Sequence, residues 1–153
     1  MPPTNFSWFI TDRIAALGLP SSRADIEFLC SIGVKQLISL TESRPSLHGC
    51  QLTPVHIPIE DMTPPTIEQV NEFLSVTELA YLKEEAVAVH CMYGLGRVGT
   101  MLACYLVKTT HCSALEAISI VRRKRPGSIE TQQQEKLVQE FSASLRSRPD
   151  QTI

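Results

Sequence analysis

The sequence has no long hydrophobic run, little net charge and no terminal targeting pattern, and each absence excludes a class of protein. No apolar stretch approaches the roughly 18 residues that span a bilayer, so we expect no membrane-spanning helix and no membrane partner. The chain starts with Pro2 and Pro3 where a secretory signal would have basic and then apolar residues. A formal net charge of −2 over 153 residues offers no bulk attraction for nucleic acid, which we also do not expect as a partner.

The sequence also lacks an even set of cysteines with the spacing of a metal site, and it lacks linker-like segments. The five cysteines are an odd number without the spacing of a metal site: Cys30, Cys50, Cys91, Cys104 and Cys112. We therefore expect reduced thiols, no metal, no cofactor, and a location in the cytoplasm with the nucleus as a second compartment. Without repeats or linkers, residues 1–153 are expected to form a single domain with its own core, and we expect a monomer.

Strand and helix patterns alternate along the chain. Short apolar or alternating segments predict strands near residues 5–10, 13–17, 34–40, 55–59 and 87–89. Apolar residues at helical spacing predict helices near residues 22–32, 66–83, 100–108, 113–125 and from 131 onwards. Strands that alternate with helices predict an α/β fold, a three-layer α/β/α domain around a short, mostly parallel central sheet.

The same spacing assigns side chains to the buried faces of helices. The helix from residue 66 is expected to bury one side made of Ile67, Val70, Phe73, Leu74, Thr77 and Tyr81. The helix at 113–125 is expected to bury Leu115, Ile118 and Val121. Cys30 is expected on the apolar face of the first helix, and Cys104 in the core.

The most informative stretch is VAVHCMYGLGRVGTMLACYL, residues 87–106. It predicts a buried strand, a loop with three glycines and an apolar helix, an order that gathers backbone N–H groups and a helix N-terminus around one anion. Cys91 begins the loop and Arg97 ends it. The amides and the guanidinium favour the thiolate form of the cysteine, and the planar guanidinium matches two phosphate oxygens. This arrangement predicts a nucleophilic cysteine that attacks phosphorus in line.

The loop sequence also fits two other interpretations. Residues 94–99, GLGRVG, also have the form G-x-G-x-x-G of dinucleotide-binding loops. Those loops need a second strand with an acidic residue about 20 positions later, whereas residues 113–125 have helical spacing and Glu116 lies inside them. A structural cysteine buried on a tight strand-to-helix turn is the second interpretation. The spacing from Cys91 to Arg97, together with the adjacent His90, favours the nucleophile.

The string HCMYGLGRVGT resembles the signature of the cysteine-dependent protein tyrosine phosphatase superfamily, in which five residues separate His-Cys from Arg. GLGRVGTMLACYLVK is similar to the small atypical dual-specificity phosphatases, and so are the strings NFSW, LISLTE, DMTPP and RPGSIET, which extend the likeness over nearly the whole chain. The resemblance implies a protein tyrosine phosphatase-like fold and a cofactor-independent hydrolase. Its substrates would be phosphorylated proteins, dephosphorylated at phosphotyrosine and also at phosphoserine or phosphothreonine through a phosphocysteine intermediate.

The resemblance also implies roles for individual residues. Cys91 would be the nucleophile, Arg97 the phosphate-binding cation, and Asp61 of the DMTPP segment the general acid, while its neighbour Glu60 is expected at the surface. Acid catalysis suits this reaction because the alkoxides of serine and threonine are poor leaving groups. The residues expected to bind the phosphate through loop N–H groups are Met92, Tyr93, Gly94, Leu95, Gly96 and Arg97.

Four further residues are expected to support the chemistry. His90 would point away from the loop and help to hold it. Glu130 would position the water that hydrolyses the phosphocysteine or would only begin the last helix, and Gln134 is a weaker candidate beside it. Val98 departs from the pattern of the family that the chain resembles, which usually has Ser or Thr at this position. Since Val98 offers no hydroxyl to the leaving sulfur, breakdown of the intermediate should be slow.

Two alternative functions and one charged segment stay open. A phosphoinositide or RNA phosphatase is one alternative, although lipid-directed relatives have lysines in the loop and Met92, Tyr93 and Leu95 are uncharged. A phosphoprotein-binding module with very slow turnover is the other. The run of cations at residues 122–125 fits either a helix C-terminus or a surface that attracts acidic phosphopeptides.

Overall fold

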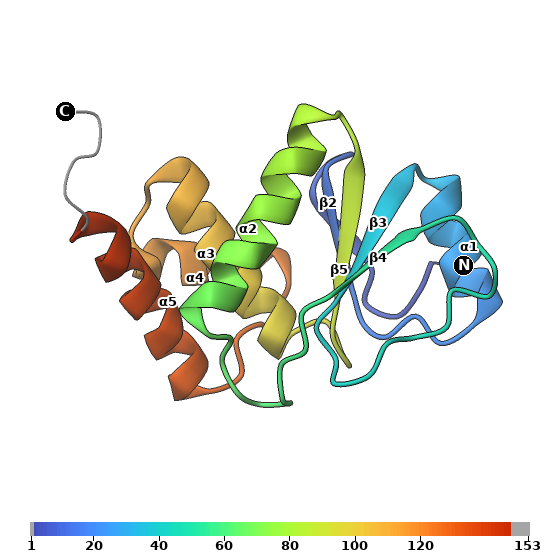
Figure 1. Ribbon diagram of the computed structural model, residues 1–153. Coiled ribbons are helices and arrows are strands. Elements are labelled where there is room, and N and C mark those ends of the chain that lie inside the picture. The colour runs from blue at the N-terminus through green and yellow to red at the C-terminus, as the bar shows by residue number, and fades with distance from the viewer. Residues whose placement is uncertain (1, 148–153) are drawn as a thin grey trace.

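A five-stranded sheet forms the middle layer of the computed structural model, which describes residues 2–147 (Figure 1). The strand order is β1-β2-β5-β3-β4. β1 (Ser7–Ile10) pairs antiparallel with β2 (Ile14–Leu17). The remaining neighbours are parallel, and they involve β5 (Ala86–His90), β3 (Val34–Ser39) and β4 (Thr53–His56). The predicted three-layer, mostly parallel α/β fold is confirmed.

The helices cover the two faces of this sheet unequally. α1 (Arg23–Ser31) packs on one face over a small apolar cluster. The other four helices pack on the opposite face around the main core (Figure 1): α2 (Ile67–Leu82), α3 (Gly96–Thr110), α4 (Ala114–Lys124) and α5 (Gln132–Arg146). α3 is the most buried of them, since eleven of its fifteen residues are buried. The helix of the most informative stretch, residues 87–106, therefore lies at the centre of the fold.

Helix N-caps explain where most helices begin, and one helix is an exception. Ser22, Thr66, Ser113 and Thr131 each accept a hydrogen bond from a backbone N–H in the first turn of the helix that follows. Leu95 is the N-cap of α3, and its side chain makes no such bond. The first N–H groups of α3 therefore keep their capacity to bind an anion.

Three expectations about burial are wrong. Leu115 is 70% exposed, because α4 packs through the small Ala114 and Ala117, which allow it to approach α3 closely. Tyr81 is 59% exposed and does not enter the core. Instead, Cζ of the Arg13 guanidinium lies over its ring, 4.6 Å from the ring centre. Cys30 is exposed, because the short α1 buries only Ile26 and Leu29.

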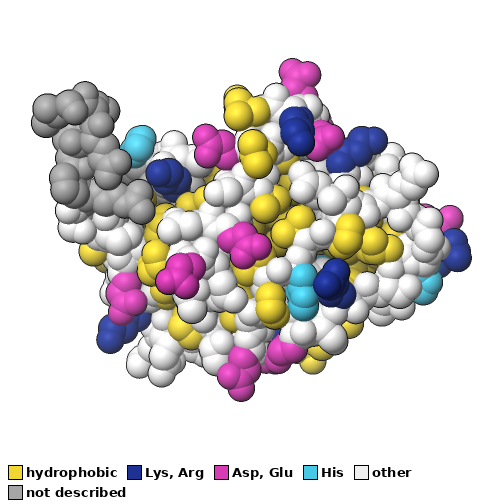
Figure 2. Space-filling model, in the orientation of Figure 1, with side chains coloured by type: hydrophobic (Ala, Val, Ile, Leu, Met, Phe, Trp, Pro, Cys, Tyr) yellow, Lys and Arg dark blue, Asp and Glu magenta, His cyan; other side chains and the backbone are white. Residues whose placement is uncertain are grey.

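The segments that follow β3, β4 and β5 all lie at the carboxyl edge of the sheet, at the lower end of Figure 1. Parallel sheets bind ligands at this edge, so it is the place for the site. Figure 2 shows acidic, basic and apolar side chains interspersed over the face that carries α2, in keeping with the small net charge. Within residues 2–147, none of the helices combines the length and the apolar character that crossing a bilayer demands.

Candidate active site

The loop between β5 and α3 has the form of an anion cradle. Cys91 follows directly after β5 and is 3% exposed. Gly94 has φ +75, and a Cβ there would lie 2.6 Å from the carbonyl carbon of Leu17, so only glycine fits. Met92 and Tyr93 project outward and are 41% and 64% exposed. The loop thus brings its predicted phosphate-binding residues together between a buried thiol and the open N-terminus of α3.

Arg125 supports this loop from behind, a role that the sequence did not suggest. Its Nε and Nη2 donate to the carbonyl oxygen of Gly94 at 3.3 and 2.7 Å, and its Nη1 donates to Ser7 Oγ at 2.6 Å and to Ala16 O at 3.3 Å. Burial lowers the pKa of Arg125, but a guanidinium keeps its charge. Arg125 therefore joins the loop to β1 and β2 and adds positive charge near Cys91.

The other cations of residues 122–125 are largely occupied inside the molecule as well. Arg122 donates to the carbonyl oxygens of Ser128 and Ile129, at 3.0 and 2.9 Å. Lys124 Nζ donates to Phe9 O at 3.0 Å and lies 4.8 Å from the centre of the Phe9 ring. The sequence predicted either a helix C-terminus or a surface for acidic phosphopeptides at residues 122–125. It did not predict that these cations bind backbone carbonyls of a loop and a strand and so link them to α4.

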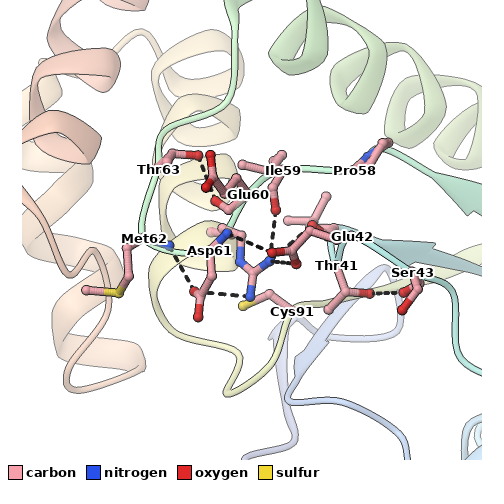
Figure 3. A network of polar contacts seen from close by, with 12 residues as sticks. Thr41, Glu42, Ser43, Pro58, Ile59, Glu60, Asp61, Met62, Thr63 and Cys91 are labelled. Atoms are coloured by element: carbon pink, nitrogen blue, oxygen red, sulfur yellow. Dashed lines mark hydrogen bonds and ion pairs between the residues drawn. The ribbon is translucent and has the colours of Figure 1, made fainter.

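Arg97 is held in place by two segments from the neighbouring strands. Its Nη1 donates to Glu42 Oε1 and to Ile59 O, both at 2.9 Å. Its Nη2 pairs with Asp61 Oδ1 at 3.2 Å, in the network drawn in Figure 3. The guanidinium is 2% exposed, so its direction is fixed by these contacts. Sequence reasoning assigned no role to Glu42, although it lies in the LISLTE string.

Glu42 and Asp61 form one connected arrangement around Arg97. Glu42 Oε2 accepts from the backbone N–H of Asp61 at 3.2 Å, and Asp61 Oδ1 accepts from Met62 N at 2.9 Å. Backbone hydrogen bonds within Glu42 and from Asp61, followed by the bond from Arg97, lower the pKa of Glu42. The side chain of Asp61 is 53% exposed, and in Figure 3 it points into the same space as the Cys91 thiol. Glu60 is exposed, as expected.

His90 is fully buried behind the loop, on the last residue of β5. Its Nε2 lies 2.7 Å from Ser39 Oγ and its Nδ1 lies 3.2 Å from Cys91 O. Because a carbonyl can only accept, Nδ1–H donates to Cys91 O and Nε2 accepts from the Ser39 hydroxyl. Burial lowers the pKa of His90 to about 4, so the imidazole is neutral near pH 7. The His90 side chain therefore links β5 to β3 behind Cys91.

The remaining three supporting candidates lie around the start of α3. Val98 is completely buried in the main core, to which Cys91 also belongs. Gln134 is completely buried, and its Oε1 accepts from the backbone N–H groups of Glu130 and Thr131, at 2.7 and 3.2 Å. The Glu130 carboxylate lies over Gly96, where an added Cβ would collide with it. Gln134 is thus a capping residue of α5, while Glu130 stays close to the cradle.

The site has the parts of a phosphoryl-transfer centre. A buried thiol, a fixed guanidinium, uncapped helix N–H groups and an exposed carboxylate converge at one edge of the sheet. Within the described range of 2–147, no three His, Cys, Asp or Glu side chains are gathered in a way that could hold a metal ion. The chemistry available to these groups is nucleophilic attack on phosphorus with acid assistance.

Comparisons with known proteins agree with this geometry. A family model described as "Swiss Army Knife protein, DSP-PTPase phosphatase domain" matches residues 3–138. The chain is 33% identical over 92% of its length to Protein tyrosine phosphatase domain-containing protein 1 of Bos taurus, and 33% identical over 88% to Dual specificity protein phosphatase CDC14C of Homo sapiens. It spans only 20% and 33% of the lengths of these two relatives. The crystal structure of Tk-PTP in the active form superposes with a TM-score of 0.81 at 32% identity, covering 88% of this chain and 95% of that one.

Proposed function

The chain belongs to the dual-specificity phosphatase domains of the protein tyrosine phosphatase superfamily, and from this premise we propose that it hydrolyses phosphotyrosine in proteins, with phosphoserine and phosphothreonine as further substrates. The single observation that carries the proposal is the position of Arg97 between Glu42 and Asp61, beside a buried cysteine. Asp61 pairs with the phosphate-binding cation and is 53% exposed, so it can meet a leaving group. Glu42 is exposed as well, but its two carboxylate oxygens are engaged by Arg97 Nη1 and by the backbone N–H of Asp61.

In the first step, the Cys91 thiolate attacks phosphorus, and the bond from phosphorus to the substrate oxygen breaks as the sulfur–phosphorus bond forms. Nη1 of Arg97 is engaged by Glu42 and Ile59, which leaves the Nη2 side for two phosphate oxygens. A phosphoryl group bound there replaces Asp61 on Nη2. The released Asp61 carboxylate takes up a proton from solvent, and the carboxylic acid so formed gives this proton to the departing oxygen.

In the second step, water attacks the phosphocysteine and the sulfur leaves as thiolate. Asp61, now a carboxylate, accepts the proton of that water and is ready for another cycle. Glu130 is the second group that could orient the water, since its carboxylate lies over Gly96 at the start of α3. Val98 offers no hydrogen bond to the leaving sulfur, so this step should limit the rate.

We extend the proposal to the setting of the reaction. The domain would act as a monomer on phosphorylated proteins, without metal or cofactor, in the cytoplasm and in the nucleus. Its place in the superfamily would be with the small atypical members, near dual specificity protein phosphatase 23, as the strings shared with that group suggest.

Pre-steady-state hydrolysis of an aryl phosphate and of a phosphotyrosine peptide tests the proposal. We expect a burst of aryl alcohol equal to the enzyme concentration, followed by slower phosphate release. Cys91→Ser should abolish both phases yet keep its affinity for phosphate, because the loop amides and Arg97 remain. If the wild-type protein bound phosphopeptides but gave neither a burst nor steady release, it would be a phosphoprotein-binding module.

A further inference from the structure

A groove of about 410 Å³, here called the side groove, lies next to the catalytic loop, and the chemistry proposed above does not use it. One wall is formed by residues 19–21, which follow β2, and the other by the loop after β3 at residues 41–48. Met92, the residue after the catalytic cysteine, is also part of its lining. The side groove is therefore continuous with the site at which the phosphoryl group would be bound.

Both walls of the side groove are attached to the catalytic residues. The backbone N–H of Leu19 donates to Met92 O at 2.9 Å, which fixes the first wall to the phosphate loop. In the second wall, Glu42 holds Arg97 at 2.9 Å. A group bound in the side groove would thus have a defined position relative to Cys91.

The second wall is ordered by its own hydrogen bonds. Thr41 Oγ1 donates to Ser43 O at 2.6 Å, and the Thr41 carbonyl lies 2.8 Å from Nε2 of His56 on β4. The backbone N–H of His48 donates to Ser46 Oγ at 3.1 Å. A wall that is already ordered loses little conformational entropy when it binds a ligand, which favours recognition.

The charges in the side groove favour an anionic group. Its one carboxylate, that of Glu42, is already engaged by Arg97 and by the backbone N–H of Asp61. The remaining ionisable groups in the lining are the Arg44 guanidinium and the His48 imidazole. Leu19, Pro20, Pro45 and Met92 add an apolar surface suited to the aliphatic part of a side chain. This mixture fits an amino-acid side chain better than a wholly polar sugar phosphate.

From these features we infer that the side groove binds an acidic side chain of the phosphoprotein, close in sequence to the phosphorylated residue. The inference rests on the proposed function and defines its substrate class. Met92 adjoins Cys91, and an extended peptide advances about 3.3 Å per residue, so the acidic residue would lie within about three positions. A carboxylate and a second phosphate group are both anions that can accept hydrogen bonds from the Arg44 guanidinium, so either one could fill this role.

The test compares kcat/KM for phosphotyrosine peptides that differ only near the phosphorylated residue. One set carries Glu at single positions from −3 to +3, a second carries Gln there, and a third carries a second phosphorylated residue. At one of these positions, we expect kcat/KM of the anionic peptides to exceed that of the Gln peptide by up to about fivefold, the size of a favourable surface charge pair. The first and third sets distinguish a carboxylate from a second phosphate, and a preference for either supports the inference.

Arg44→Gln should remove this preference and Arg44→Glu should reverse it, while hydrolysis of an aryl phosphate stays within about twofold. Lys35→Glu is the matched control, since it makes the same charge change at the amino end of β3, away from the carboxyl edge. That variant should keep the wild-type peptide preference. The same peptides are bound to Cys91→Ser to measure affinity without turnover.

Failure of the inference and failure of the proposed function give different results. Equal rates on all peptides, unchanged by Arg44→Glu, in a protein that hydrolyses aryl phosphate would overturn the inference alone. An Arg44-dependent affinity for anionic peptides without any hydrolysis would overturn the function and keep the groove assignment. Faster turnover of an inositol bisphosphate headgroup than of every peptide, again dependent on Arg44, would assign the groove to a lipid phosphate and overturn the peptide assignment.

Discussion

At the scale of single residues, Val98 stands where the resemblance to the phosphatase family leads us to expect Ser or Thr. Val98→Thr is nearly isosteric and places a hydroxyl in the buried start of α3. A hydrogen bond to the leaving thiolate is worth roughly 1.5–3 kcal/mol, which corresponds to about ten- to a hundredfold in the second step. We expect kcat to rise and the burst of aryl alcohol to shrink. Val107→Thr, the same change deeper in α3, is the control and should leave kcat unaltered.

Asp61 provides the second prediction at this scale. Asp61→Asn should remove the basic limb of the pH–rate profile, because the amide has no proton to give to the leaving oxygen. The loss should be about 10²- to 10⁴-fold for an alkyl phosphate and much smaller for an activated aryl phosphate. Glu60→Gln, at the exposed neighbouring position, is the control. Equal losses with good and poor leaving groups would show that Asp61 only positions Arg97 through their ion pair.

At the scale of elements, the phosphate loop depends on β1, β2 and α4 through Arg125. A lysine cannot satisfy the carbonyls of Gly94 and Ala16 together with the Ser7 hydroxyl, and each buried polar group left without a partner costs about 1–3 kcal/mol. Arg125→Lys should therefore lower the melting temperature and also weaken inhibition by inorganic phosphate. Arg122 is 42% exposed and donates to the carbonyl oxygens of Ser128 and Ile129, so Arg122→Lys should not change the inhibition constant. An unchanged inhibition constant in Arg125→Lys would limit Arg125 to a role in stability.

The strand β5 carries a pH-sensitive group in His90. Its pKa of about 4 lies below the ordinary value of 6.5, so unfolding takes up a proton when the pH is below 6.5. The contribution of neutral His90 to the free energy of unfolding is fully present above pH 6.5 and is lost as the pH falls toward 4. At pH 5 the free energy of unfolding is lower by about 2 kcal/mol. The melting temperature should fall by roughly 4–8 °C between pH 7 and pH 5. His90→Gln should show a smaller decline, and an equal decline would mean that other groups cause it.

Much of the element scale could be predicted from the sequence, and the exceptions have a common physical cause. Caps such as Ser22 and Thr131 depend on local chemistry, which one segment of sequence contains. Leu115 was assigned to the core because helical spacing cannot tell which of two apolar stripes meets a partner helix. Packing through alanines decides that, and packing is a property of two segments together.

At the scale of the whole molecule, the site residues that sequence spacing predicted are local to one segment, whereas those that the sequence did not predict come from separate segments. Cys91 and Arg97 share one loop, so their spacing was visible in the sequence. Glu42 and Arg125 reach this loop from 55 and 31 residues away, to Arg97 and to Gly94. Glu42 comes there because β3 lies beside β5 in the sheet, and Arg125 because α4 packs against α3. The side groove is also made by the fold, since its walls come from separate segments of the chain.

The uncapped start of α3 makes the substrate a structural component of the protein. Within residues 2–147, the four other helices each have a side chain that caps the N-terminal turn, whereas the first N–H groups of α3 are left to bind an oxyanion. Amide protons at residues 95–98 should then exchange with solvent quickly in the free protein and slowly when phosphate is bound. Hydrogen–deuterium exchange at those amides would report occupancy of the cradle directly, even in variants that no longer turn over substrate. The first event of catalysis in this chain would then be the binding of a phosphate group that accepts hydrogen bonds from the first N–H groups of α3.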